Sequence, residues 1–335
     1  MTEARRVVVT GLGAVTPLGA TLAATRGALE RGASYESTFD ARGFASARSA
    51  SVAPFDERRF FRAPKALKLC DRRTRLAVAA AAMAFDDGGP ARVDADRTGV
   101  VVGTSGSDLG AEELSRALGT DEPERAATDV PFFAERILSG LSPLWLLVHL
   151  PNMVSAHVAI QLEARGPNTT VMTGWAAGLQ AVHEGAEQVR EGAADVVLAG
   201  GADSALHPFA FAGLEQAGLL QRGLVPGEGA AMFRLEERSA ALARGARIHG
   251  EIASGASGVR FSKGPLAFEA DDLAARAGHL LAALAPLRLA LTLLGRAGTE
   301  AFEIAAEGPC GEWASVTALA AGARAFEPAL FEASA

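Results

Sequence analysis

The stretch that decides the fold reads GPNTTVMTGWAAG, from Gly166 to Gly178. A β-prone run ends at Gly174, and apolar residues then recur at the spacing of a helix, at Leu179, Val182, Ala186 and Val189. We therefore predict a strand, a tight glycine turn and a helix in succession. This arrangement places residue 175 at a helix N-terminus, where backbone N–H groups converge and favour a thiolate. An acyl-transfer enzyme would carry cysteine there, but this chain carries Trp175, and an indole is not a nucleophile.

Length and composition are those of a globular chain without extreme charge. The 335 residues are 49% apolar, enough for one large compact body or two fused halves. Lysine and arginine number 32 against 39 aspartates and glutamates, a net charge of −7 that disfavours a nucleic-acid or membrane-surface partner. The N-terminal MTEARRVVVTG lacks the apolar core of a signal peptide, and the apolar stretch 142–148 is too short to cross a bilayer. We predict a cytoplasmic protein.

The two cysteines, Cys70 and Cys310, are too few for a disulfide scaffold and indicate a reducing compartment. Cys70 precedes Asp71, Arg72 and Arg73, and the two arginines would lower its pKa if they lay beside the sulfur. The alternative is that both cysteines are inert filling residues.

Short apolar runs alternate with alanine-rich helical patterns along the whole chain. The pattern predicts an α/β fold with a largely parallel sheet covered on both faces. A polar stretch, 112–129, is expected to be an excursion on the surface. The apolar stretch 142–161 carries Pro143 and Pro151 and is expected to be a broken helical region. Strands are expected over 5–10, 98–103, 194–201, 229–236, 248–255, 301–306 and 313–320, and helices over 71–86 and along the leucine stripe 280–294.

Two sequence patterns resemble a dinucleotide loop and a metal site, but each lacks residues that such a site needs. GLGAVTPLG, from Gly11 to Gly19, has Thr16 where a dinucleotide loop needs its third glycine, and Pro17 would interrupt the helix that receives the pyrophosphate. His149 and His157 lie eight residues apart with no carboxylate on the same face, so they are read as core or interface residues rather than metal ligands. We predict neither a cofactor nor a metal.

The motifs taken together resemble β-ketoacyl synthases. The resemblance implies the thiolase fold: two similar α/β halves in layers (α-β-α-β-α), here with a truncated C-terminal half, and dimers with a broad interface. The halves would be residues 1–220 and 221–335. The first half carries the strand–turn–helix around Trp175, called the elbow below, in which the nucleophile position is altered. The motifs that carry the resemblance, in the family's order, are VVVTGLGAVTPLG at 7–19, DRRTRLAVAAA at 71–81, PNMVSAH at 151–157, GPNTTVMTGWAAGLQAV at 166–182, ADVVLAGGAD at 194–203, PGEGAAMFRLEE at 226–237 and GHLLAALAPLRLAL at 278–291.

The same resemblance implies that the catalytic set is incomplete. Working members use a cysteine that takes the acyl chain, two histidines that assist decarboxylation, and a lysine. The cysteine falls on Trp175, the second histidine on His279 and the lysine on Ala274, and no histidine is followed by the Gly-Thr of the first motif. The segment that would carry that histidine is missing between about 257 and 270, and the terminal glycine turn survives only in part at 308–311.

Three functions follow from this resemblance. The first is a non-catalytic subunit similar to the chain length factors of bacterial type II polyketide and polyene synthases. It would pair with an active ketosynthase, meet acyl carrier protein through that complex, and shape the partner's acyl tunnel. Leu144 and Trp145, with Met153 behind them, are the candidate gate residues; the alternative is that they only form interface core. The second function is a malonyl-carrier-protein decarboxylase, which needs no nucleophile but needs the pair of histidines, and the third is a structural scaffold. In the first, Trp175 fills a vacated acyl pocket.

Overall fold

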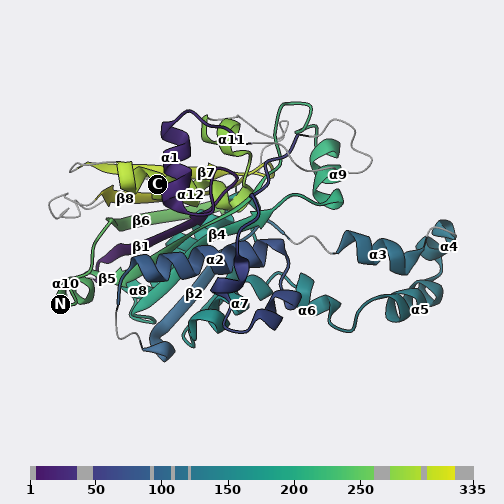
Figure 1. Cartoon of the computed structure of the whole chain (residues 1–335), viewed down its shortest axis with the longest axis horizontal. Helices are drawn as coiled ribbons and strands as arrows, with labels where there is room; N and C mark the ends of the chain where they lie inside the picture. The colour runs from purple at the N-terminus through teal and green to yellow at the C-terminus, as the bar shows by residue number, and fades with distance from the viewer. Residues whose placement is uncertain are drawn as a thin grey trace.

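A computed structural model describes residues 5–35, 48–90, 94–106, 110–119, 122–259, 272–295 and 300–320. The described strands form one eight-stranded sheet in the order β3-β2-β4-β5-β1-β6-β8-β7 (Figure 1). A mixed α/β fold is thereby confirmed. The strands are β1 (Val7–Val15), β2 (Thr98–Gly103), β3 (Asn168–Val171), β4 (Val196–Ser204), β5 (Glu228–Glu237), β6 (Gly250–Val259), β7 (Ala301–Glu307) and β8 (Glu312–Ala320).

Helices lie on both sides of the first five strands of this sheet. α2 packs on β1, β4 and β5 and is covered by α7, whereas α8 and α12 occupy the opposite side. α8 also contacts β6 and β8, so the sheet turns around these helices. The described helices are α1 (Leu22–Glu30), α2 (Arg72–Asp87), α3 (Ala111–Leu118), α4 (Pro123–Thr128), α5 (Val130–Gly140), α6 (Trp145–His149), α7 (Met153–Leu162), α8 (Ala177–Arg190), α9 (Pro208–Gln216), α10 (Arg238–Ala243), α11 (Asp272–Ala277) and α12 (Leu284–Gly295), with short 3₁₀ turns η1 (Glu57–Phe60), η2 (Pro64–Leu69), η3 (Ala95–Arg97), η4 (Gly174–Ala176) and η5 (Leu281–Ala283).

The expected α-β-α-β-α layering of two similar halves stays a prediction, although α8 and α12 contact strands from both ends of the sheet. Residues of β7 alternate between exposed and buried, with Phe302 and Ile304 inward and Ala301, Glu303 and Ala305 outward. The outer side of β7 therefore faces solvent in the part of the chain that the structure describes, and a fifth, helical layer is not seen there. The division of the chain at residue 220 stays a prediction; β5, which follows that residue, lies between β4 and β1.

The prediction of a largely parallel sheet is wrong. Only β2 with β3 and β2 with β4 pair in parallel, and the other described pairs are antiparallel. The cause is partly local, because β7 and β8 are joined by the tight turn at 308–311, which forces the second strand back along the first. Strands buried on both faces have the same apolar pattern in either direction, so the sequence pattern does not predict whether neighbouring strands run parallel or antiparallel.

β1 continues as a buried strand through the glycines that resembled a dinucleotide loop. α2 crosses it so closely that a Cβ on Gly11 would lie 1.9 Å from the carbonyl oxygen of Ala84, and one on Gly13 2.1 Å from that of Ala80. The glycines therefore permit helix–strand contact, and the exclusion of a dinucleotide loop at this position agrees with the fold.

The polar stretch after β2 forms a helical arm, made of α3, α4 and α5, that stands clear of the sheet (Figure 1). The chain returns through α6, breaks at Pro151 and continues as α7 beneath α2. The surface excursion and the broken helical region are both confirmed. α5 and α6 expose several large apolar side chains, including Val130, Phe133, Leu138, Leu146 and Leu147.

Candidate functional site

The predicted strand–turn–helix is present at the elbow. β3 ends at Val171, the chain turns at Gly174 with φ of 80°, and η4 leads directly into α8. A positive φ suits glycine, since other residues are strained there. Trp175 follows this turn and is buried, with 8% of its surface exposed.

The indole of Trp175 fills an apolar pocket above the elbow. It belongs to a cluster of buried residues with Ala205, Leu219, Leu224 and Leu281, and side chains of α9 pack around this cluster. The ring also lies against the imidazole of His279, with 4.2 Å between ring centroids and 47° between planes. The structure therefore brings together Trp175 and His279, two positions more than one hundred residues apart in sequence.

His279 lies in a loop held by backbone pairing. Its N–H donates to the carbonyl of Val225 at 2.8 Å, and its Nδ1 accepts the N–H of Leu281 at 3.2 Å. The residue is buried, and so is Ala274 on α11. Both line a small cavity of about 170 Å³, whose other lining residues are Tyr35, Arg48, Gly223, Val225 and Ala275. An alanine methyl provides no charge at the position where the resemblance implies a lysine.

Asp203, which the sequence reasoning did not single out, holds the His279 loop against the sheet. Its carboxylate accepts hydrogen bonds from Thr104 Oγ1 (2.8 Å), from the N–H of Ser105 (3.0 Å) and from the N–H of Ala282 (2.9 Å). Burial raises the pKa of Asp203 to about 6, against the lowering effect of these donors. A carboxylate at the end of a buried strand, as in GGAD, was the available signal.

Glycines form the surface on which the same loop rests. A Cβ on Gly178 of α8 would lie 2.0 Å from the carbonyl oxygen of Ala282, and one on Gly201 of β4 would lie 2.2 Å from it. The loop that carries His279 therefore packs directly on helix and strand backbone, without side chains between them.

Glu312 was also missed by the sequence reasoning. It is the first residue of β8, and its buried carboxylate accepts the N–H of Trp175 at 3.1 Å and the N–H of Cys310 at 3.0 Å. This carboxylate ties the glycine turn at 308–311 to the elbow. Cys310 itself is exposed on that turn.

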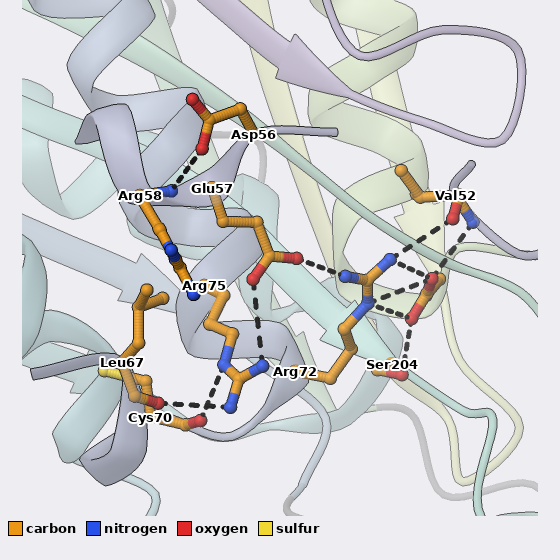
Figure 2. A network of polar contacts seen from close by, with 10 residues as sticks. Val52, Asp56, Glu57, Arg58, Leu67, Cys70, Arg72, Arg75 and Ser204 are labelled. Carbon is orange, nitrogen blue, oxygen red and sulfur yellow. Dashed lines mark hydrogen bonds and ion pairs between the residues drawn. The ribbon is translucent and has the colours of Figure 1, made fainter. Parts of the chain in front are cut away.

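Cys70 is buried, and Figure 2 shows that its neighbour Arg72 is engaged by other groups. Arg72 binds both oxygens of Glu228, at 2.8 and 3.0 Å, as well as Glu57, so its charge is directed away from the sulfur. Burial, followed by repulsion from Asp71, raises the pKa of the Cys70 thiol to about 12. The reading of Cys70 as a filling residue is therefore the one that the structure supports.

The proposed gate residues lie where the helical arm rejoins the body. Leu144 exposes 49% of its surface, whereas Trp145 is half-buried and its ring lies against that of His149, with centroids 5.2 Å apart. Met153 begins α7 and is half-buried. The three side chains thus lie on one short segment, and Leu144 is the most accessible to another chain.

The described residues offer little other chemistry. Among them, no three histidine, cysteine, aspartate or glutamate side chains are grouped closely enough to hold a metal ion. His149 and His157 are both buried, on different helices. In the same ranges, no helix has the length and apolar character needed to cross a membrane.

Comparison with known proteins identifies the class to which this fold and elbow belong. The Beta-ketoacyl synthase, N-terminal domain, family matches residues 4–241. The chain is 33% identical over 273 residues to 3-oxoacyl-[acyl-carrier-protein] synthase 2 of Synechocystis sp., over 75% of this chain and 62% of that protein. It is also 33% identical over 270 residues to the tetracenomycin polyketide synthase ketoacyl synthase alpha subunit of Streptomyces glaucescens, over 74% of this chain and 61% of that protein.

The chain therefore belongs to the β-ketoacyl synthase family and is related to the 3-oxoacyl-carrier-protein synthases of fatty-acid and type II polyketide elongation. It spans about six tenths of the length of these curated relatives. Among solved structures, the ishigamide ketosynthase/chain length factor matches with a TM-score of 0.79 at 23% identity, over 96% of this chain and all of that one. A type II ketosynthase complex with its acyl carrier protein, AntDE:AntF, matches with a TM-score of 0.76 at 20% identity, over 95% of this chain and all of that one. These two matches show the fold.

Proposed function

We propose that the chain is a non-catalytic subunit, similar to a chain length factor, that pairs with an active ketosynthase and limits the acyl tunnel of that partner. The observation that carries the proposal is the buried Trp175 at the elbow. An indole there neither accepts an acyl group nor leaves space for one, because the pocket above the elbow is filled by the ring and its leucine neighbours. A thioester intermediate cannot form without a nucleophile.

The state of His279 agrees with this proposal. Its ring face is covered by Trp175, and its Nδ1 is engaged by the N–H of Leu281. Ala274 stands in the position of the lysine. Catalytic groups that act as a unit do not retain useful turnover through one surviving member. A malonyl-carrier-protein decarboxylase is disfavoured for the same reason, because it needs a pair of histidines.

The surface supports an obligate partner. Large apolar side chains are exposed along α5, α6 and α7, with Leu138 at 83% and Val130 at 74%. Ile160 on α7 and Met172, just after β3, are exposed as well. β3 is one of the two edge strands of the described sheet, and an open edge beside apolar surface is a place where another chain adds.

A ketosynthase is the partner that fits best. Dimers of one fold place the same face of each subunit against the other, so a related subunit presents a matching surface. One structural neighbour is the ishigamide ketosynthase/chain length factor, and another is a ketosynthase with its carrier protein. Acyl carrier protein would meet this chain through the complex.

The segment that would limit the partner's tunnel is the gate formed by Leu144, Trp145 and Met153. Leu144 and Trp145 lie at the root of the helical arm, with Met153 behind them. In the paired state Leu144 would contact the partner directly, and Trp145 would act from its place against His149. Removing bulk at a tunnel end lengthens the chain that fits, so Trp145→Ala should shift the products to longer chains.

Co-expression with a ketosynthase encoded beside this chain tests the proposal. We expect a one-to-one heterodimer by size-exclusion chromatography with light scattering, and no acetyl product when the pure chain meets malonyl-carrier protein. Turnover by the pure chain would favour the decarboxylase instead. Intact assembly with an unchanged product profile in Trp145→Ala would favour a structural scaffold without a gate.

A further inference from the structure

We infer that the elbow retains an oxyanion-type amide pocket and that the side chain of Glu312 is its resident ligand. The pocket is made by two backbone N–H groups from segments far apart in the chain, those of Trp175 and Cys310. Each oxygen of the Glu312 carboxylate accepts one of them, Oε1 from Trp175 at 3.1 Å and Oε2 from Cys310 at 3.0 Å. Hydrogen bonds from N–H groups to a carboxylate are about twice as strong as neutral ones.

The environment of Glu312 shows that these amides hold the charge. The residue is only 8% exposed. Within the described ranges, no lysine, arginine or histidine lies within ion-pair distance of its carboxylate, which accepts hydrogen bonds from the two N–H groups. Burying an unpaired carboxylate is costly unless donors replace the lost water, so the amide pair and the start of α8 are what make this placement possible.

The backbone is shaped around the carboxylate. A Cβ on Gly174 would lie 2.2 Å from Oε1, and a Cβ on Gly308 would lie 1.6 Å from the same oxygen. Any side chain at either position would therefore displace the carboxylate. Gly174 and Gly308 belong to segments far apart in the chain, so one local turn does not account for both close approaches to the carboxylate.

The pocket lies at the elbow, so its two donors bear on catalysis as well as on stability. Backbone N–H groups at a nucleophile elbow are where an acyl-transfer enzyme stabilises the negative oxygen of its intermediate. Here the same kind of donor already binds a negative oxygen from the chain itself. Glu312 thus closes the pocket to an acyl oxygen independently of the Trp175 indole. The inference concerns the isolated chain and stands whether or not the proposed pairing is correct.

The class of ligand that the pocket selects is a small carboxylate, and shortening Glu312 should expose this preference. We would prepare the full chain with Glu312→Ala and measure its melting temperature in sodium acetate, in sodium formate, and in sodium chloride of equal ionic strength. The expected result is a melting temperature lowered by the substitution and raised again, with saturation, by acetate or formate but not by acetamide. Wild type should show no difference between acetate and chloride.

Glu251→Ala is the matched control, because Glu251 is a partly buried carboxylate that pairs with Arg6 rather than with backbone amides. The melting temperature that Glu251→Ala loses should not be recovered in acetate beyond its value in chloride. An acetate response in Glu312→Ala no larger than in this control would overturn the inference.

Glu312→Gln provides a second test if the alanine variant does not fold. It keeps the shape of the side chain but has one carbonyl oxygen and no charge. In protein labelled with ¹⁵N-tryptophan, the backbone N–H signal of Trp175 should move upfield in this variant, since a carboxylate acceptor is lost, while that of Trp145 stays in place. An unmoved Trp175 signal would show that the carboxylate is not its acceptor.

Discussion

Trp175→Ala is the change that most directly tests the role of the indole. The side chain is nearly fully buried, and its neighbours Leu219, Leu224 and Leu281 are buried as well, so the site has little freedom to collapse. Truncation of a buried tryptophan to alanine costs about 3–5 kcal/mol of unfolding free energy, from lost burial and from the cavity that remains. The contact with the His279 ring, at 4.2 Å between centroids, is lost in addition.

Urea unfolding followed by far-ultraviolet circular dichroism measures this loss, provided the slope with urea is unchanged. Trp313→Ala is the matched control, because Trp313 is a half-buried residue of β8 and should cost about 1–2 kcal/mol. Added indole should restore part of the stability of Trp175→Ala by binding in the vacated space, as a ligand that binds only the folded state does. Indole should not stabilise Trp313→Ala.

A loss below about 1 kcal/mol in Trp175→Ala, together with no response to indole, would refute the reasoning. It would mean that the pocket above the elbow collapses or is already filled with water. The proposal that tryptophan replaced an acyl group as filler would then have no energetic basis.

Three further predictions concern single groups. Ellman's reagent at pH 8 should label one thiol quickly in the native chain and two in urea, because Cys310 is exposed and burial raises the pKa of Cys70 to about 12. Burial also raises the pKa of Asp203 from its ordinary 3.8 to about 6, so the folded state binds this proton more tightly than the unfolded state. The stabilisation is complete below pH 3.8 and is lost as pH rises through about 6, and Asp203→Asn should lack that slope in urea titrations across this range. Leu138→Glu, at an 83% exposed position, should leave the melting temperature of the free chain unchanged and weaken the heterodimer in a pull-down with the ketosynthase; equal capture would place the interface elsewhere.

The local part of the site was predictable from the sequence, because it depends on neighbours in the chain. The turn at Gly174 and the helix after it follow from glycine placement and apolar spacing, whereas the burial of residue 175 was expected only from the family resemblance. Strand direction was not predictable, since it depends on which segments pair across the sheet. The apolar runs of β4 and β5 would read the same in a parallel sheet.

The polar partners could not be predicted, because they join distant segments. Glu312 meets the N–H of Trp175 across 137 positions, and Asp203 meets Ala282 across 79. No spacing rule links such residues. For Cys70, the sequence left activation by adjacent arginines and inert filling both open, and the tertiary contact of Arg72 with Glu228 supports the second.

The strand–turn–helix at the elbow contributes to the fold apart from any chemistry at residue 175. α8 begins at the elbow and packs on β2 and β4 on one side and on β6 and β8 on the other, so the turn before it fixes how the two groups of strands meet. Asp203 ties the His279 loop to β2 and β4, and Glu312 ties β8 to the start of α8. Each of these contacts holds a catalytic-looking geometry for reasons of packing and charge. Variants at Asp203 or Glu312 should therefore be detected first as a loss of folding stability.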